Sequence, residues 1–260
     1  MSESRALTDW IGFTTIIIRE FSRIVRIWGQ TIVPPAVTAT LYFVIFGSLI
    51  GRRVGQVGGY DYRQFIAPGL IMMTVITNSY GNVVSAFFGA KFGKHIEELL
   101  VSPLPNWLIV AGYVMGGVLR GLLVGAVVTI ISLFFTRLSI HHALAIIMAA
   151  FLTSFIFALG GFINALFAKN FDQISWFPTF VLTPLTYLGG VFYSVTMLPG
   201  WAHMASNANP ILYMVSAFRF GFLGTTDVDL RLAYAIMISA AAVMFGLAVA
   251  LLNRGTGIRE

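Results

Sequence analysis

Hydrophobic residues form long uninterrupted runs along most of this 260-residue chain. The longest intervals without Asp, Glu, Lys or Arg are 27–51, 64–90, 99–119, 138–168, 173–218 and 232–253. A helix that crosses the hydrocarbon layer of about 30 Å needs about 20 mostly apolar residues, and each interval is long enough. The pattern predicts an all-α, polytopic membrane protein with six transmembrane helices in one domain, at 31–50, 65–88, 107–135, 143–168, 175–196 and 232–253.

An amphipathic helix is expected before the first span. Apolar side chains recur there in steps of three and four residues, at Trp10, Phe13, Ile17, Phe21, Ile24 and Trp28. This spacing places them on one face of a helix, whereas Arg19, Arg23 and Arg26 fall largely on another. A basic polar face with tryptophans is typical of helices in the membrane interface. We therefore expect an interfacial helix over residues 8–29; the alternative is a simple cytoplasmic leader.

The interval 173–218 is too long for one helix, and its second half is interrupted by Pro199, Gly200, Asn207, Asn209 and Pro210. We interpret 197–220 as a re-entrant element that enters from the outer face, where protein or a water-filled cavity buries the broken backbone. With six spans, nine basic residues share the side of the two termini, and six, including Arg219, lie on the other. This excess favours cytoplasmic termini.

Composition agrees with a membrane protein, because 58% of the residues are hydrophobic and only 10% are charged, against roughly a quarter charged in soluble domains. The chain has no cysteine, which excludes disulfides and thiolate metal sites. A net charge of +6 without a long basic run indicates flanks that face anionic lipid and the cytoplasm rather than nucleic acid. His141 and His142 lack a nearby third ligand, so we expect no metal site.

Charge placement also bears on the energy source. All ten acidic residues lie outside the predicted spans, and Arg120 is the one charge within them. Ion-coupled transporters usually need an ionisable group near the midplane. The stretch from Gly89 to His95 is the nearest match to a P-loop, but it is one residue short and lacks the hydroxyl that follows the lysine. If ATP drives this protein, another subunit binds ATP and Mg²⁺, and this chain binds no cofactor.

Arg120 has two open interpretations. It lies among Gly112, Gly116, Gly117, Gly121 and Gly125, and small residues four apart let helices approach closely. We therefore expect span 3 to lie deep within the bundle. There the guanidinium either lines a hydrated path or binds an anionic headgroup, or it bonds to neighbouring helices. Span 2 carries a polar cluster with the same two interpretations, interhelical bonding or a substrate path: Thr74, Thr77, Asn78, Ser79, Tyr80 and Asn82.

Four stretches carry a family resemblance. Arg19–Arg26 resembles an amphipathic connecting helix, and Phe65–Met73 the opening of a second span. Glu97-Glu98-Leu-Leu-Val-Ser-Pro103 is similar to a coupling helix. The segment from Pro184 to Gly224, with Gly189-Gly190, Leu198-Pro199, Asn209-Pro210 and Phe218-Arg219, resembles a C-terminal signature. Together these stretches resemble the ABC-2 type permeases, bacterial exporters of drugs, lipids and polysaccharides, along nearly the whole chain.

The resemblance implies a dimer, most simply a homodimer, with two copies of a separate ABC ATPase, in the bacterial inner membrane. It implies that the cytoplasmic segment 91–105 and the connecting helix contact the ATPase through Phe92, Lys94, Glu97, Glu98, Leu99, Ser102, Glu20, Arg23 and Arg26. It places the substrate path near spans 1, 2 and 5. The candidates for path or packing, from the resemblance and from the residues together, are Arg120, Asn78, Tyr80, Asn82, Tyr42, Tyr187, Phe192 and Tyr193. The substrate would be amphiphilic, lipid-like, drug-like or a glycan, moved outward.

Three alternatives remain at this point. Glu97 and Glu98 would also suit a simple solvated helix face. An ion-coupled secondary transporter or a channel would be recognised by ion dependence or a membrane carboxylate. A polytopic lipid-modifying enzyme would need acidic or histidine clusters at a membrane face, which Asp172 alone does not supply.

Overall fold

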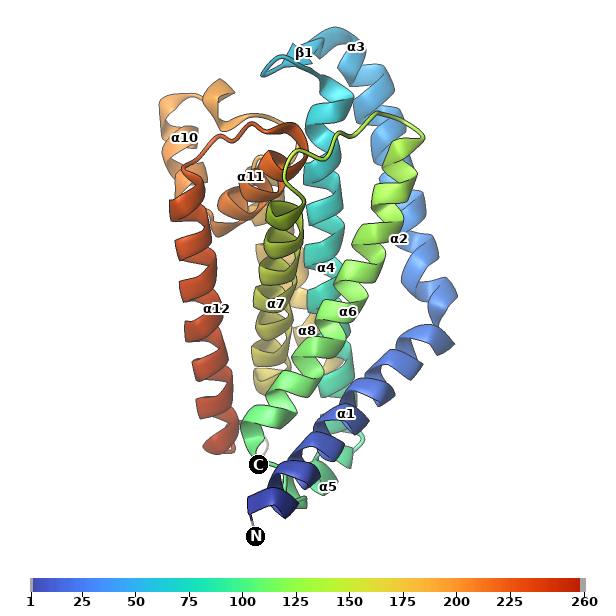
Figure 1. Cartoon of the computed structure of the whole chain (residues 1–260), viewed down its shortest axis with the longest axis vertical. Coiled ribbons are helices and arrows are strands. Elements are labelled where there is room, and N and C mark those ends of the chain that lie inside the picture. The colour runs from blue at the N-terminus through green and yellow to red at the C-terminus, as the bar shows by residue number, and fades with distance from the viewer. Residues whose placement is uncertain (1, 258–260) are drawn as a thin grey trace.

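The computed structural model describes residues 2–257. Most of the chain forms long helices that run from one end of a bundle to the other (Figure 1). Within the described residues, five helices are long and apolar enough to cross a membrane by length and composition. They are Trp28–Val54, which comprises α2 (Trp28–Tyr42), a π-helical stretch (Phe43–Ile50) and α3 (Gly51–Val54), followed by α4 (Tyr62–Phe92), α6 (Asn106–Leu133), α7 (Ala143–Phe167) and α12 (Leu230–Asn253).

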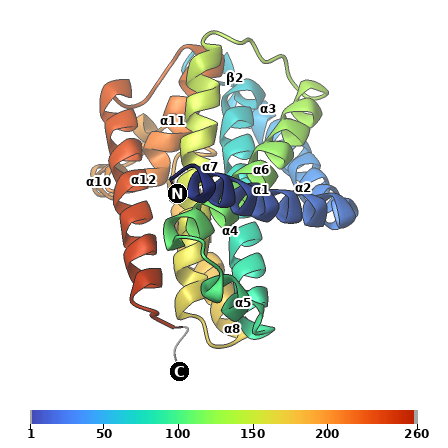
Figure 2. The same cartoon turned by 60° about the horizontal axis from the view of Figure 1, so that its bottom comes forward.

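The two ends of the bundle carry different short elements (Figures 1 and 2). At one end, called the α5 end below, lie α1 (Ser2–Arg26), α5 (His95–Val101) and the end of α12. At the opposite end, the α10 end, lie α10 (Gly200–Asn207) and a small antiparallel pair of strands, β1 (Gln56–Val57) and β2 (Tyr60–Asp61). The chain bends between α1 and α2 at Ile27, so α1 lies across the α5 end (Figure 2).

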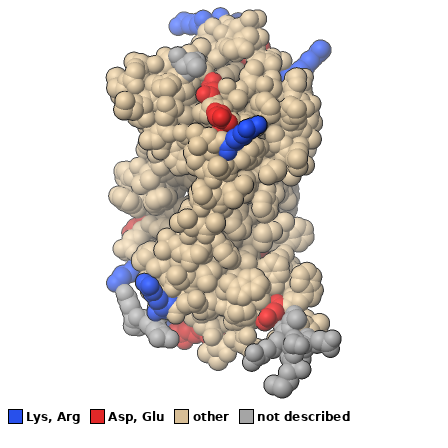
Figure 3. Space-filling view, turned by 60° about the vertical axis from the view of Figure 1, so that its left-hand side comes forward, with Lys and Arg blue, Asp and Glu red and all other residues tan. Residues whose placement is uncertain are grey.

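Charge follows the same division. Figure 3 shows Lys, Arg, Asp and Glu gathered towards the two ends of one face, with a broad band of other residues between them. A band without charges is what the hydrocarbon layer requires, because a charged side chain there is costly unless it is paired or hydrated. The distribution supports placing the long helices across the bilayer.

The predicted fifth span, 175–196, is wrong at its C-terminal boundary. Three consecutive elements, α8 (Phe171–Phe177), a π-helical stretch (Pro178–Leu182) and α9 (Thr183–Leu188), run without a break and end at Leu188. Gly189 and Gly190 follow, and Gly190 adopts a φ of 73°, which favours glycine. A Cβ at Gly189 would lie 2.6 Å from the Cγ2 atom of Ile211. The glycine pair therefore ends the helix and turns the chain towards α11 (Pro210–Leu223). Helix α11 is shorter and is not one of the five helices that are long enough to cross a membrane.

Helix α4 forms the centre of the bundle. In its most apolar 18-residue stretch 61% of the residues are buried, against 17% in Trp28–Val54 at the edge of the bundle. Helix α6 joins this centre through its glycines, as the sequence predicts. A Cβ at Gly125 would lie 2.7 Å from Val75 of α4, and one at Gly112 would lie 2.7 Å from Ile16 of α1. Close approach on two sides of α6 therefore depends on the absence of side chains.

Arg219 is buried. The sequence places it among the six basic residues on the side opposite the termini, and treating it as exposed to the outer solution is wrong. Its side chain, 1% exposed, lies with the guanidinium carbon 3.9 Å from the ring centroid of Phe65. Its Nη2 donates to the Gly190 carbonyl (2.6 Å), and its Nη1 lies 3.3 Å from a carboxylate oxygen of Asp227. Hydrogen bonds from both Nη atoms and a cation–π contact stabilise the buried charge and join α11 to α4 and to the turn after α9, whereas Nε has no partner among the described residues.

Candidate coupling surface and membrane cavity

Four of the predicted coupling residues, all in the segment from the end of α4 to the middle of α5, form an exposed surface at the α5 end. Phe92, Lys94, Glu97 and Glu98 are exposed, and Phe92 exposes 65% of its surface. Lys94 adopts a φ of 58°, so the chain reverses sharply between α4 and α5. Glu97 and Glu98 lie in the first turn of α5, where the helix dipole favours negative charge. The surface combines two carboxylates with exposed apolar side chains, Phe92 and, at 87%, Val101.

The other face of α5 fixes this helix to the bundle. Ile96 is buried in the hydrophobic core, and Leu99 is partly buried against it. The Ser102 hydroxyl donates to the Leu99 carbonyl, and Ser102 adopts an extended conformation that ends the helix before Pro103. Leu99 and Ser102 therefore hold α5 in place, whereas the two carboxylates stay exposed.

The connecting helix α1 uses Glu20 and Arg23 inside the protein. Glu20 is 2% exposed and lies 2.7 Å from Nη2 of Arg23 and 3.7 Å from Nη2 of Arg19. The same Arg23 nitrogen donates to Oδ1 of Asn82 on α4 at 2.8 Å, and Arg19 donates to the Tyr113 hydroxyl on α6. In this arrangement Glu20 and Arg23 join α1 to the bundle. Of the three predicted residues in this helix, Arg26 is the exposed one.

A cavity of about 450 Å³ separates the two coupling elements. Arg19, Glu20 and Arg23 line it from α1, and His95, Glu98 and Leu99 line it from α5. Ala86 and Ala90 of α4 form the wall between them. The two segments that sequence reasoning assigned to one partner therefore lie on either side of one hollow, here called the coupling cavity.

A second cavity, of about 350 Å³, lies between α2, α4 and α6 and is called the membrane cavity below. Its polar lining brings together three of the predicted path residues, Tyr42, Asn78 and Arg120. Thr77, next to Asn78, and Thr74, one turn before it on α4, also line the cavity, as do Gln30 and Thr38 of α2. Tyr80 and Asn82 are buried instead: the Tyr80 hydroxyl accepts a hydrogen bond from Asn164, and its ring stacks on Phe177.

Four aromatic side chains meet beside the membrane cavity. The hydroxyls of Tyr42 and Tyr187 lie 2.9 Å apart, which joins α2 to α9. Phe192 lies between them, with ring centroids 5.6 Å from each, and 4.6 Å from Phe46. Tyr42 belongs to both the cluster and the cavity lining. Tyr193 is half-buried and takes no part in the ring contacts of these four residues.

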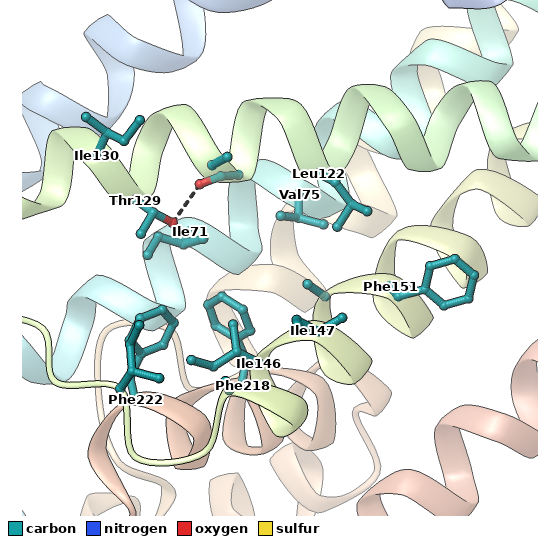
Figure 4. A pocket seen from close by; sticks show the side chains of 15 residues that line it. Ile71, Val75, Leu122, Thr129, Ile130, Ile146, Ile147, Phe151, Phe218 and Phe222 are labelled. Atoms are coloured by element: carbon teal, nitrogen blue, oxygen red, sulfur yellow. Dashed lines mark hydrogen bonds between the residues drawn. The ribbon is translucent and has the colours of Figure 1, made fainter.

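Sequence reasoning missed a larger apolar cavity of about 580 Å³ between α4, α6, α7 and α11. Figure 4 shows Val75, Leu122, Ile147 and Phe218 converging on it from four helices. The space arises where small residues face one another, among them Gly125, Ala126, Ala143 and Ala150. A run of small residues on facing helices is a visible signal, but which helices face one another requires the tertiary structure.

Two comparisons with known proteins agree with this geometry. The model of a family described as ABC-2 type transporter matches residues 12–223. Inner membrane transport permease YadH of Escherichia coli (strain K12) is 53% identical over 251 residues, which cover 96% of this chain and 98% of that protein. Nodulation protein J of Rhizobium leguminosarum bv. trifolii is 28% identical over 82% of each chain.

The chain therefore belongs to the ABC-2 type transporter family. It is a multi-pass membrane protein that resembles an inner membrane transport permease throughout its length. Family membership implies a partnering ABC ATPase and a membrane subunit that is not itself catalytic.

Proposed function

We propose that this chain is the membrane-spanning subunit of an ATP-driven ABC exporter. Two copies form a homodimer, each bound to one copy of a separate ATPase that holds ATP and Mg²⁺. The complex moves an amphiphilic substrate, which is lipid-like, drug-like or a glycan, outward across the inner membrane. The observation that carries this proposal is the exposed surface of Phe92, Glu97, Glu98 and Val101, which is attached to α4 and lies beside α1.

Coupling would follow from the way these elements are joined. Glu97 and Glu98 would pair with basic groups of the ATPase, and Phe92 and Val101 would enter an apolar groove there. Helix α4 leads directly into α5 and also forms one wall of the membrane cavity. A displacement of α5 by the ATPase would therefore move that wall. Glu20 and Arg23 link α1 to α4 through Asn82, so we assign them to transmission within the permease. The expected motion is a rigid-body rocking of the two bundles.

The substrate path would run through the membrane cavity and past the aromatic cluster. Arg120 and Asn78 supply polar contacts in the middle of the bundle, and Tyr42 and Tyr187 close the cavity towards α9. Helix α2 is the least buried of the five long helices, which leaves its outer face for lipid or for the second protomer. We propose that Phe171–Leu188 also crosses the membrane, as the fifth of six crossings in chain order. In this topology α10 and α11 form a re-entrant element, and both termini lie in the cytoplasm.

A charge reversal tests the coupling surface. We expect Glu97→Lys with Glu98→Lys to abolish co-purification of the permease with its ATPase and to remove stimulation of ATP hydrolysis. Asp172→Lys is the matched control, since Asp172 is an exposed carboxylate on α8 at the same end of the bundle. Co-purification and stimulation that survive the double reversal would show that α5 is a solvated helix face.

A further inference from the structure

Four buried side-chain nitrogen atoms have no hydrogen-bond acceptor among the described residues; one is Nε of Arg219 on α11, and the other three lie on α1, α4 and α6. These three are Nε of Arg23 on α1, Nδ2 of Asn82 on α4 and Nε of Arg120 on α6. Asn82 itself is 1% exposed. Each of the three atoms is an N–H donor, and a buried donor without an acceptor costs about 1–3 kcal/mol. The three helices therefore share a need for one kind of group, a hydrogen-bond acceptor.

The three donors lie close to one another. Arg23 and Asn82 are in direct contact through the 2.8 Å hydrogen bond to Oδ1 of Asn82. Arg120 lies one turn of α6 after Gly116, which packs against Glu20, the carboxylate that contacts Arg23. Arg23 lines the coupling cavity and Arg120 lines the membrane cavity. The three donors therefore lie where α1, α4 and α6 meet: Arg23 and Arg120 face one cavity each, and Asn82 is buried.

Charge at this place is not balanced. Glu20 is the carboxylate in contact with Arg23, and Arg19 shares it. The described residues that line the membrane cavity include no carboxylate beside Arg120, only neutral polar groups such as Gln30, Thr38 and Asn78. A guanidinium presents a planar set of donors that matches an oxyanion in two-point contact. An acidic ligand would supply both the acceptors and the negative charge.

We propose that Arg23, Asn82 and Arg120 bind the acidic headgroup, a phosphate or a carboxylate, of an amphiphile that occupies the membrane cavity. The headgroup lies against Arg120, which lines the cavity, and enters between α4 and α6 to reach the buried Asn82 amide one turn of α4 after Asn78. The apolar tail extends along α2 into the bilayer. The exposed Val33, Val37 and Leu41 give α2 an apolar face for that tail. The assignment of this ligand as transported cargo rests on the proposed exporter function; its binding to the permease does not.

Binding is measured on the purified full-length permease in neutral detergent, without the ATPase. The probes are dioctanoyl phosphatidic acid, dioctanoyl phosphatidylcholine with the same tails, and inorganic phosphate. Each probe is titrated while the thermal unfolding midpoint is recorded, because a ligand that binds only the folded state raises that midpoint with concentration. We expect saturable stabilisation by phosphatidic acid at a concentration at least tenfold lower than for phosphatidylcholine. If phosphate alone stabilises the permease as much as phosphatidic acid does, the ligand is not an amphiphile, and the site binds a free anion instead.

Two substitutions locate the binding site. Arg120→Gln should weaken phosphatidic acid binding roughly tenfold or more, the loss expected for one charge-assisted hydrogen bond, and Arg120→Lys should weaken it less. Arg137→Gln, which removes an exposed arginine after α6, should leave it unchanged. Asn82→Asp places a carboxylate against Arg23, so it should raise the unfolding midpoint without lipid and weaken phosphatidic acid binding. A raised unfolding midpoint would show that the Asn82→Asp variant folds, so its weaker lipid binding would come from the new carboxylate and not from misfolding.

Equal binding of the acidic and zwitterionic lipids, or unchanged binding in Arg120→Gln and Asn82→Asp, would overturn this inference and leave the exporter function standing. Binding as described, combined with no effect of phosphatidic acid on the ATPase complex, would retain the site and count against its ligand as cargo.

Discussion

Gly116 of α6 lies directly against Glu20 of α1. A Cβ placed on Gly116 would lie 2.8 Å from Cβ of Glu20 and 2.9 Å from its Cγ. Glu20 also contacts Arg23, which bonds to Asn82 of α4. This one glycine therefore lets α1 approach α6 closely enough for the charged residues of α1 to reach α4.

We expect Gly116→Ala to displace α1 from the bundle. Neither Glu20 Cβ nor the α6 backbone can yield without a shift of a whole helix, so we estimate a loss of about 1–3 kcal/mol of folding free energy. ATP hydrolysis by the partner should lose stimulation by substrate, because α1 no longer moves with α4. Thermal unfolding of the permease and ATPase assays of the complex measure the two effects.

The control for this substitution is Gly81→Ala on α4, where an added Cβ meets nothing within 4 Å. Alanine favours a helix over glycine by about 1 kcal/mol, so Gly81→Ala should hold or raise the unfolding midpoint. If Gly116→Ala behaves like Gly81→Ala, neither the stability of the permease nor the stimulation of ATP hydrolysis requires the close approach of α1 to α6.

Asp227 should be essential to the α10 end of the bundle. Removing its charge by Asp227→Asn leaves the buried Arg219 guanidinium without its counter-ion, and breaking such a pair typically costs about 3–5 kcal/mol. Asp229→Asn is the control: Asp229 is exposed and its side chain caps α12 by accepting from the Arg231 amide. Because asparagine caps a helix about as well, this change should be nearly neutral. Chemical or thermal unfolding of both variants decides the point; equal stability would mean that Arg219 does not depend on Asp227.

The hydroxyl pair of Tyr42 and Tyr187 should hold α2 to α9. A double-mutant cycle of Tyr42→Phe and Tyr187→Phe should give a coupling energy of about 0.5–1.5 kcal/mol, the usual net value of one hydrogen bond. Tyr42→Phe with Tyr213→Phe should instead be additive, since the Tyr213 hydroxyl donates to the Asn207 carbonyl elsewhere. Substrate-stimulated ATP hydrolysis should rise in the Tyr42→Phe variant if this contact restrains the path. Additivity in both cycles would show that the hydrogen bond between Tyr42 and Tyr187 does not stabilise the protein.

Much of the helical architecture was predictable from hydrophobic runs, because spans in a bilayer must be long and apolar. The end of the fifth helix was not, since residues 189–198 are as apolar as those before them. What ends the helix is a glycine pair placed against Ile211, a contact across the bundle that no local pattern reveals. For the same reason Arg219 resembled a surface charge: its partners, Gly190, Phe65 and Asp227, come from three separate segments.

The candidate site was predictable in part. Residue type identified Arg120 and Asn78, and the structure brings them to one cavity together with Tyr42, a candidate given with the family resemblance. The family resemblance supplied Tyr187 and Phe192, which the structure places against Tyr42. Sequence alone could not show that Glu20 is buried, because a charged residue on an amphipathic helix is normally exposed. Only its neighbours Arg19, Arg23 and Gly116 make burial tolerable.

Single cysteines test the arrangement of the α10 end. The natural chain has no cysteine, so each introduced thiol reports one position. We expect Asn207→Cys, on exposed α10, to react with a membrane-impermeant maleimide added to intact cells. Gly255→Cys, after α12, should react only in inverted vesicles. Labelling of both positions from the same side would contradict the proposed six crossings.

Transport by reconstituted protein tests the central claim most directly. Vesicles containing the permease with its ATPase, or the permease alone, are loaded with a fluorescent acidic lipid whose crossing is followed by quenching. The account predicts movement only with the ATPase, ATP and Mg²⁺ together, and no movement by the permease alone under proton or sodium gradients. Cargo moved by the permease alone under an ion gradient would contradict it.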